Sequence, residues 1–573
     1  MATILTRPMH KNLRYFIFLI WAAVLAGLLA AACAKVNKTY YERWPLQGDT
    51  ASYWLRDLAL LDHESTTGYR AAILDVAKNN ARDPLRTASF ALLKPHNILS
   101  VNGHLYFSGF AAFLFFLALS LCLWARTRSL LYSLGAPVVI LLAQGLYDPM
   151  YGMPSRLPDI PSALFFGAAL FLLFIKRSAP DPKLIFLSGV LLGLATLSRY
   201  HVWIYGAFVL GPVVTIYAFN QYINKGRLLS ELLISHLAFL AGLFLVSGWF
   251  IIGSAADVFK FYAVAGYALN KTIFTALSTT GMKLFVNFFG LKAIITLLLI
   301  TIGYVAIGWL GRKKLDIADF IAILWGGLSC LFLILIIMRV EDDVGQTYYM
   351  MPGLILLCLS PFCLLHEGST STIRSSFSRF ALGLALLLPA FVYASYTTWI
   401  KSEGFIYPRP HAQQIYAFNK ELAKVVAKVL PPKSDKVPVI DTNFDYYARY
   451  IIPELQMRFD RQSRFGNVFQ IRQSQWQLSF TGSAIEDKLR IMPALNSKVD
   501  VFVALTDFDS PDVLLLLKDD YTRDLAAFVA GQLKNESATW APVGRVMSPY
   551  GSEVTIYLNM ARQRSLTDPS KSE

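Results

Sequence analysis

The chain has 573 residues, of which 55% are hydrophobic and 16% are charged, and its mean hydropathy is +0.46. A soluble protein of this length would carry more charge on its surface, so the composition excludes an ordinary soluble globular fold. The formal net charge of +15 could indicate nucleic-acid binding, but the basic residues stand mostly at the ends of apolar runs and form no single patch. The five cysteines also fall within apolar runs, so no disulfide framework is expected.

The apolar runs predict a bundle of membrane-spanning helices. A spanning helix needs roughly 20 predominantly apolar residues. About eleven runs approach this requirement, and they begin near Tyr15, Leu105, Leu131, Ile160, Leu184, Val202, Leu232, Leu284, Ile317, Gly353 and Ala381. The fold class predicted for this part is therefore an all-α polytopic membrane bundle.

Short basic loops give the orientation of the bundle. Every second loop carries lysine or arginine: Arg126 with Arg128, Lys176 with Arg177, Lys225 with Arg227, Arg312 to Lys314, and Arg374 with Arg379. Basic loops are retained in the cytoplasm, so the loops between them are predicted to lie outside. An odd number of spans places the C-terminus outside as well. The sequence predicts a multi-pass protein of the bacterial inner (plasma) membrane.

Two outer loops are long. The first runs from about Ala34 to His104, and its apolar residues recur at helical spacing, which predicts amphipathic helices on the membrane surface. The second is predicted to begin at Ser254 and to end at Lys283. Both lie on the predicted outer side, where they would cover one end of the bundle.

The composition changes after residue 400, which predicts a second, extracytoplasmic domain over residues 401–573 beside a membrane domain over residues 1–400. The segment His411 to Leu430 has the pattern of an amphipathic helix. Short apolar runs at Val437 to Ile440 and Val499 to Leu505 predict buried strands, and Val543 to Leu558 predicts a hairpin that turns at Tyr550-Gly551. The second domain is therefore predicted to be α/β.

Five motifs stand at the predicted outer ends of the spans: Gly48-Asp49, Lys94-Pro95-His96, Arg156-Leu157-Pro158-Asp159-Ile160-Pro161, Gly193 to Arg199, and Tyr348-Tyr349-Met350-Met351-Pro352. In their order and topology they resemble the GT-C membrane glycosyltransferases, especially the aminoarabinose-transferase and protein-mannosyltransferase branch. The resemblance covers roughly the first 400 residues. The chain departs from the family pattern at Thr50, His96 and Arg199, where family members commonly have Glu, Pro and Lys.

The resemblance implies transfer of a sugar from a polyprenyl-phosphate carrier to a glycan, lipid or protein acceptor at the outer face, with inversion. It implies that Asp49 or Asp159 acts as the catalytic carboxylate and that Lys94 and Arg199 hold the carrier phosphate. His96, Tyr348 and Tyr349 are the further expected substrate-binding residues. No cofactor is implied with certainty, a divalent cation remains open, and no nucleic-acid partner is expected.

Simpler interpretations exist for the same residues. Asp49 and Asp159 could each cap a helix, because aspartate is a favoured residue at helix N-termini. Lys94 and Arg199 could be interfacial cations that extend toward the headgroups. His236, within a predicted span, is expected to be a hydrogen-bonded packing residue.

Two functions of other classes also fit a polytopic chain. One is a transporter or flippase for a lipid-linked glycan, and the other is a non-catalytic assembly subunit that kept the fold. Transporters often show repeated halves and charged residues near the bilayer midplane. The chain shows no repeat and its spans are nearly free of charge, which favours the enzyme.

Overall fold

The computed structural model describes residues 11–41, 53, 68, 71, 83–86, 89, 102–127, 130–141, 143–148, 152–176, 181–225, 229–265, 317–337, 348–364, 412–429, 438–443, 472–473, 483–508, 520–548 and 551–567. The chain divides into two compact units. The first comprises Met1–Asn37 and Thr67–Ile406, and the second comprises Lys38–Thr66 and Tyr407–Glu573.

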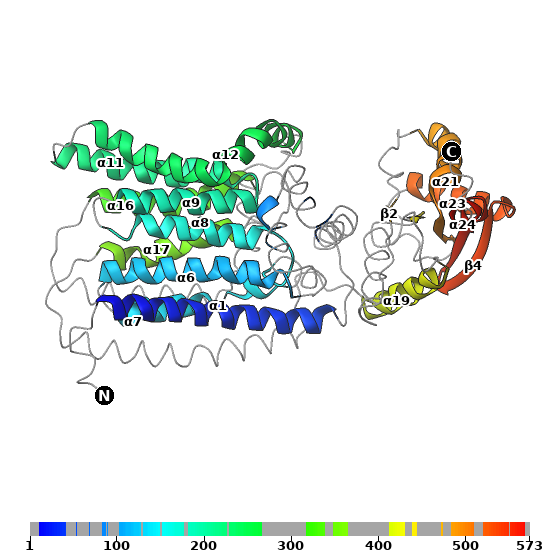
Figure 1. Cartoon of the computed structure of the whole chain (residues 1–573), viewed down its shortest axis with the longest axis horizontal. Helices are drawn as coiled ribbons and strands as arrows, with labels where there is room; N and C mark the ends of the chain where they lie inside the picture. Colours follow the sequence, from blue (N-terminus) through cyan, green and yellow to red (C-terminus); the bar gives the residue numbers. More distant parts are fainter. Residues whose placement is uncertain are drawn as a thin grey trace. The chain divides into compact units, whose positions relative to one another are not determined.

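The first unit is helical, and its long helices lie side by side (Figure 1). The helices of the described part of this unit are α1 (Lys11–Tyr41), α6 (Leu105–Thr127), α7 (Leu130–Ile140), α8 (Asp159–Leu173), α9 (Pro182–Ser198), the short α10 (Val202–Tyr205), α11 (Gly211–Lys225), α12 (Leu229–Ala265), α16 (Ile317–Ile337) and α17 (Met350–Leu364). A 3-10 turn, η1 (Gln144–Tyr147), follows α7, and a π-helical turn, η2 (Gly206–Leu210), joins α10 to α11.

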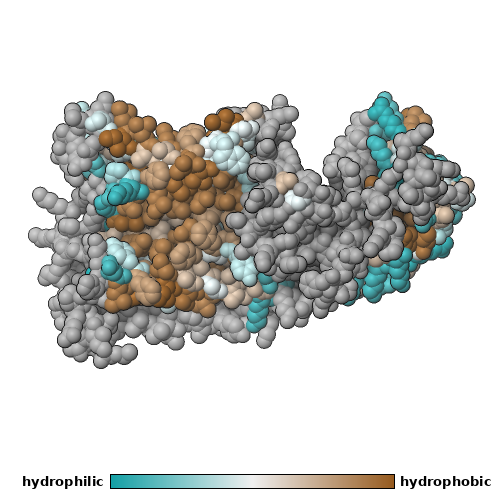
Figure 2. Space-filling model, viewed as in Figure 1, coloured by the Kyte–Doolittle hydropathy of each residue, from teal (hydrophilic) through white to brown (hydrophobic). Residues whose placement is uncertain are grey.

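Among the described residues, four helical segments are long and apolar enough to cross a membrane: Asn12–Asn37, Leu105–Arg126, Val202–Ile223 and Leu232–Ala256. Shorter apolar helices cover Asp159–Leu173, Pro182–Ser198 and Ile317–Cys330. Figure 2 shows a broad hydrophobic surface over these helices, with hydrophilic side chains gathered toward its ends. The chain is an integral membrane protein by these features. The predicted spans near Leu284 and Ala381 lie outside the described residues, so the total number of spans stays a prediction.

Helix α12 passes Ser254, where the second outer loop is predicted to begin, and continues to Ala265, whereas the candidate membrane span within it ends at Ala256. The Ser254 hydroxyl donates a hydrogen bond to the carbonyl of Phe250, 2.6 Å away on the same helix, which satisfies its polar group without ending the helix. No glycine or proline follows until Gly266. Similarly, α1 continues to Tyr41, past the predicted loop start.

Helices α9 and α12 pack closely because glycines face backbone on both sides of their interface. A Cβ atom at Gly189 of α9 would lie 2.1 Å from the carbonyl oxygen of Phe239, and one at Gly242 of α12 would lie 2.1 Å from that of Phe186. Small residues at such contacts let helix backbones approach closely within a membrane.

One end of the bundle, which we call the Arg126 end, is fastened by a buried ion pair. The Arg126 guanidinium donates to both carboxylate oxygens of Asp319, through Nη1 at 2.6 Å and Nη2 at 3.2 Å. It also donates to the carbonyl of Phe174 from Nε at 2.5 Å and to that of Lys176 from Nη2 at 3.0 Å. Tyr217 on α11 donates its hydroxyl to Asp319 at 2.8 Å. The pair therefore joins α6, α11 and α16 to the residues that follow α8.

The second unit contains a five-stranded sheet with the order β2-β1-β3-β5-β4. The strands are β1 (Val439–Thr442), β2 (Arg472–Gln473), β3 (Val501–Leu505), β4 (Trp540–Met547) and β5 (Glu553–Asn559). Strands β2, β1 and β3 are parallel to one another, whereas β5 pairs antiparallel with β3 and β4. This sheet confirms the predicted α/β character for the described part.

The helices of this unit pack against the sheet through two apolar clusters. Side chains of α19 (Ala412–Val429) meet alternate residues of β3 and β5 in one cluster. Helices α21 (Ala484–Lys498) and α23 (Asp520–Asn535) meet the other residues of the same strands in the second cluster. Alternation along a strand sends successive side chains to opposite faces, so α19 covers one face and the other two helices cover the other.

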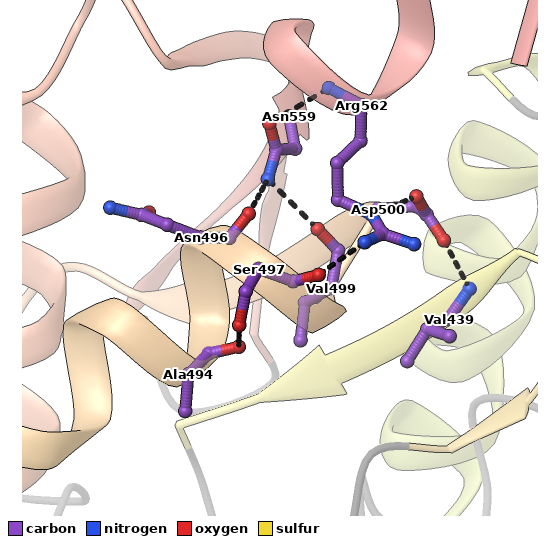
Figure 3. A network of polar contacts seen from close by, with 8 residues as sticks. All are labelled: Val439, Ala494, Asn496, Ser497, Val499, Asp500, Asn559 and Arg562. Carbon is purple, nitrogen blue, oxygen red and sulfur yellow. Dashed lines mark hydrogen bonds and ion pairs between the residues drawn. The ribbon is translucent and has the colours of Figure 1, made fainter. Parts of the chain in front are cut away.

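A polar network joins the strand ends of this unit (Figure 3). The Asp500 carboxylate accepts hydrogen bonds from the backbone N–H of Val439 at 2.7 Å and from Nε of Arg562 at 2.6 Å. Asn559 donates its side-chain amide to the carbonyls of Asn496 and Val499. These contacts connect the starts of β1 and β3 with the end of β5 and with α24 (Met560–Thr567).

Candidate active site

The end of the bundle opposite Arg126, which we call the Asp159 end, contains an ion pair between two of the predicted site residues. Asp159 is the first residue of α8 and is 2% exposed. Arg199 directly follows α9, and its Nε lies 3.1 Å from Oδ1 of Asp159. The Arg199 side chain is 14% exposed. The pair therefore stands almost out of water, with the arginine partly accessible.

Local structure explains why these two side chains meet. Helices α8 and α9 pack together, and the hydroxyl of Ser162 on α8 donates to the carbonyl of Ala195 on α9 at 2.8 Å. Ser162 and Ala195 lie within one turn of Asp159 and Arg199. The backbone at Arg199 turns from helical to extended, which ends α9. The contact between the helices thus fixes the register that brings the charges together.

This geometry differs from the simpler interpretations of the same residues. The N-cap position of α8 is taken by Pro158, which makes no side-chain cap bond, and Asp159 lies inside the first helical turn. Its negative charge suits a helix N-terminus, but its ion pair is with Arg199. Arg199 in turn is paired and largely buried, so it is not an arginine that extends along the surface to reach headgroups.

The predicted tyrosines lie at the same end. The Tyr348 hydroxyl donates to the carbonyl of Gly145 in η1 at 2.8 Å, so Tyr348 fastens the start of α17 to the turn after α7. The ring of Tyr349 lies 5.0 Å from that of Tyr205 and 5.9 Å from that of His201, centroid to centroid. All four side chains are buried. Tyr349 therefore belongs to an aromatic cluster that begins directly after Arg199, because the ring of Tyr200 also lies 5.3 Å from that of His201.

Asp49, Lys94 and His96, the remaining predicted site residues, lie outside the described residues. Their predicted roles stay predictions. The structure gives the geometry of the other four predicted site residues, Asp159, Arg199, Tyr348 and Tyr349.

Buried polar residues that the sequence analysis did not assign to the site also lie at this end. Arg86 and Arg156 are each 1% exposed, Asp83 is fully buried and His104 is 2% exposed. Nε of Arg86 lies 2.5 Å from Oδ2 of Asp83. Arg156 stands three residues before Asp159, at the head of the motif that carries the carboxylate. That position, and the i, i+3 spacing of Asp83 and Arg86, were signals available in the sequence.

His104 is an uncharged histidine within this group. Its Nε2 lies 3.1 Å from the carbonyl oxygen of Met153. Burial lowers the pKa of His104 from 6.5 to about 3, and the positive charges of Arg156 and Arg86 contribute to the same effect. The two guanidiniums therefore lie near the imidazole, and the end of the bundle contains arginines from three separate segments.

The arrangement offers guanidinium groups and a carboxylate in a site of low water content. Guanidinium groups bind phosphate and carboxylate oxygens through pairs of hydrogen bonds. Within the described residues, no group of three or more His, Cys, Asp or Glu side chains is placed to hold a metal ion. His236, by contrast, hydrogen-bonds to Thr215 and to the carbonyl of Leu232, which confirms the expected packing role.

No model of a known protein family matches the chain, and no curated protein sequence matches it. Among solved structures the chain is similar to ArnT from Cupriavidus metallidurans bound to undecaprenyl phosphate. The two are 12% identical with a TM-score of 0.48, and the match covers 94% of this chain and 97% of that one. The same protein in its apo state gives 12% identity and a TM-score of 0.49, with the same coverage.

A second similar structure is the Archaeoglobus fulgidus oligosaccharyltransferase tethered to an acceptor peptide. It is 11% identical with a TM-score of 0.38, and the match covers 95% of this chain and 74% of that one. Both neighbours are GT-C membrane glycosyltransferases, the superfamily that the five sequence motifs resemble. Because these likenesses are distant, the function proposed below rests on the residues of the site.

Proposed function

We propose that the protein is an integral membrane glycosyltransferase. It transfers a sugar from a polyprenyl-phosphate-linked donor to a cell-envelope glycan, lipid or protein acceptor at the outer face of the membrane, with inversion. The observation that carries the proposal is the buried Asp159–Arg199 ion pair at the helix ends where the sequence motifs gather.

The leaving group of such a donor is a phosphate anion, which needs electrostatic support more than a proton. Arg199 supplies a cation that is mostly buried yet partly accessible. In a site of low dielectric constant, a cation supports a departing anion more strongly than it would in water. Lys94 is the proposed second cation on the same phosphate.

The acceptor hydroxyl needs a base close to the reacting carbon. Asp49 is the proposed base, because Asp159 is already engaged with Arg199 and an ion-paired carboxylate is a weaker proton acceptor. Asp159 then orients the guanidinium toward the phosphate. Tyr349 and His96 are proposed to contact the substrate, and Tyr348 supports the wall of the site through its bond to Gly145.

A lipid carrier requires a site at the membrane boundary that hydrocarbon can reach. The helices of the first unit expose many large apolar side chains, among them Leu237, Leu245 and Ile252 of α12. The proposed location of the site, at the ends of such helices, lets the polyprenyl chain stay in lipid while its phosphate meets Arg199.

A transporter of lipid-linked glycan is less well supported. Transporters place ionisable residues near the midplane of the membrane. The buried Arg126–Asp319 pair joins the third residue of α16 to the last turn of α6. Arg126 and Asp319 both stand at helix ends, and their hydrogen bonds connect neighbouring helices.

The proposal is tested with purified protein in lipid nanodiscs and a panel of synthetic polyprenyl-phosphate sugars. Arg199→Ala should weaken donor binding about 10- to 150-fold, which corresponds to 1.5–3 kcal/mol for a hydrogen bond to a charged group. Arg199→Lys should retain part of the binding, because lysine keeps the charge but loses the planar fork. Asp49→Asn should lower turnover about 10²- to 10⁴-fold and leave folding intact.

Lys176→Ala is the matched control. Lys176 forms an ion pair with Asp181 at 2.7 Å, but this pair is exposed and lies near the Arg126 end of the bundle. Donor binding and turnover should be unchanged in this variant. Equal donor affinity in wild-type protein, Arg199→Ala and Lys176→Ala would contradict the proposed function of the Asp159 end.

A further inference from the structure

His104 connects the start of α6 to the turn that carries Arg156 and Asp159. The imidazole is buried, and its Nε2 lies 3.1 Å from the carbonyl oxygen of Met153, 49 residues along the chain. The turn from Gly152 to Pro158 also makes local bonds, for example from the backbone N–H of Gly152 to the carbonyl of Asp148 at 2.7 Å. His104 therefore ties this turn to a separate helix.

The contact fixes the protonation state of the ring. A carbonyl oxygen only accepts hydrogen bonds, so Nε2 must carry the proton in this contact. Nδ1 is buried and has no hydrogen-bond partner among the described residues. Burial is the largest cause that opposes a charge on the ring, Arg156 and Arg86 act in the same direction, and the backbone carbonyls of Met153 and Pro154 oppose them only in part. The ring is thus a neutral Nε2–H tautomer.

We propose that His104 is a positioning residue of the active site, which acts through the Met153 carbonyl to fix the turn that delivers Arg156 and Asp159. This inference rests on the proposed function, because it takes Asp159 and Arg199 as residues of the site. An imidazolium here would add a positive charge beside Arg156 and push that guanidinium away. A neutral ring supplies the same hydrogen bond without this repulsion.

A positioning role is needed because the turn must place Asp159 within contact distance of Arg199. The Asp159 carboxylate lies 3.1 Å from Nε of Arg199, on a different helix. The turn contains two prolines, which have no backbone N–H to donate, and its local bonds, such as that from the Ser155 N–H to the carbonyl of Gly152, link only nearby residues. An error of about 1 Å in a catalytic constellation can cost roughly 10²-fold in rate. A buried hydrogen bond from outside the turn removes that freedom.

Two substitutions distinguish the roles of the two ring nitrogens of His104. Glutamine places its side-chain N–H at the reach of Nε2 and can keep the bond to Met153. Asparagine is shorter; it places an acceptor near Nδ1 but cannot reach Met153. We expect His104→Asn to lower kcat about 10- to 100-fold with a smaller change in the KM for donor, and His104→Gln to restore most of that loss. The reverse order, or two variants equal to wild type, would overturn the proposal.

A second measurement needs no turnover. The coupling between Asp159 and Arg199 is measured by a double-mutant cycle of melting temperatures, with Asp159→Asn and Arg199→Gln, in purified protein. The coupling should persist in the His104→Gln background and disappear in the His104→Asn background. A purely structural histidine would lower all melting temperatures equally and leave the coupling in place, which would overturn the proposal.

The tautomer itself is observable by NMR of protein labelled with ¹⁵N-histidine. The chain has 8 histidines, and the resonance missing from His104→Gln identifies the one of interest. We expect Nε2–H with an unprotonated Nδ1 down to about pH 5, well above the pKa set by burial. An imidazolium at that pH would overturn the inference. Absence of sugar transfer in wild type would instead refute the proposed function, while the coupling and the tautomer would still decide the role of His104.

Discussion

Substitution of Arg126 by leucine tests most directly whether the Arg126–Asp319 ion pair stabilises the helix bundle. Arg126 and Asp319 are 0% and 3% exposed as side chains, and they belong to helices 193 residues apart in sequence. Arg126→Leu leaves the Asp319 carboxylate buried without its cation. It also leaves the carbonyls of Phe174 and Lys176 without their donor.

The magnitude follows from this arrangement. Loss of one partner of a buried ion pair costs about 3–5 kcal/mol, because a buried charge is left uncompensated. Tyr217→Phe removes one neutral donor to the same carboxylate and should cost about 1–2 kcal/mol. Arg126→Lys should also be destabilising, since one ammonium cannot replace the two-nitrogen contact with Asp319 and the contact with Phe174 together.

The assay is reversible unfolding in mixed detergent micelles, followed by helical circular dichroism. The double variant Arg126→Leu with Asp319→Leu is the matched control, because it removes both charges. It should recover a large part of the loss seen in Arg126→Leu alone. The Arg126–Asp319 ion pair would not hold these helices together if the unfolding free energy of Arg126→Leu were within about 1 kcal/mol of the wild-type value. The same would follow if the double variant were less stable than either single variant.

Three further outcomes are expected. Gly189→Ala should lower the melting temperature, because the added Cβ would meet α12 backbone at 2.1 Å, while Gly27→Ala, where nothing lies within 4 Å, should not. Asp500→Ala should destabilise the second unit by about 1–3 kcal/mol, since a backbone N–H and the Arg562 side chain lose their acceptor. The free energy of unfolding should fall as the pH drops from 6.5 toward 3. In this range His104 binds a proton in the unfolded chain but stays neutral in the folded protein, where its pKa is about 3. His104→Gln should lack this part of the pH dependence in melting curves.

Local patterns were sufficient for many elements. The amphipathic repeat predicted a helix from His411 to Leu430, and α19 covers Ala412–Val429. The hairpin was predicted to turn at Tyr550-Gly551, and Gly551 has a φ of +82°, which suits glycine. Both signals come from residues close together in sequence, where periodicity and turn chemistry decide the structure.

Contacts between distant segments were not predictable in the same way. Arg126 was interpreted as part of a basic loop, whereas it is buried against Asp319. The residues near Arg126 in the sequence do not indicate which helix carries its partner. Asp319 stands alone at the start of an apolar run, and its position does not indicate a pairing with Arg126 either. His104 and Met153 meet for the same kind of reason, through the packing of α6 beside the turn before α8.

The Arg126–Asp319 and Asp159–Arg199 ion pairs differ in how far the arginine side chain is exposed. At the Arg126 end, the guanidinium contacts both carboxylate oxygens, two backbone carbonyls and Tyr217, and the side chain has no exposed surface. A ligand could compete for this arginine only by breaking the contacts that join the helices. At the Asp159 end, Nε of Arg199 lies 3.1 Å from Oδ1 of Asp159, and the Arg199 side chain keeps 14% of its surface exposed. The proposed function uses this difference in exposure: an incoming phosphate would meet the accessible part of Arg199 while Asp159 orients the guanidinium, whereas the fully buried Arg126 serves to join helices.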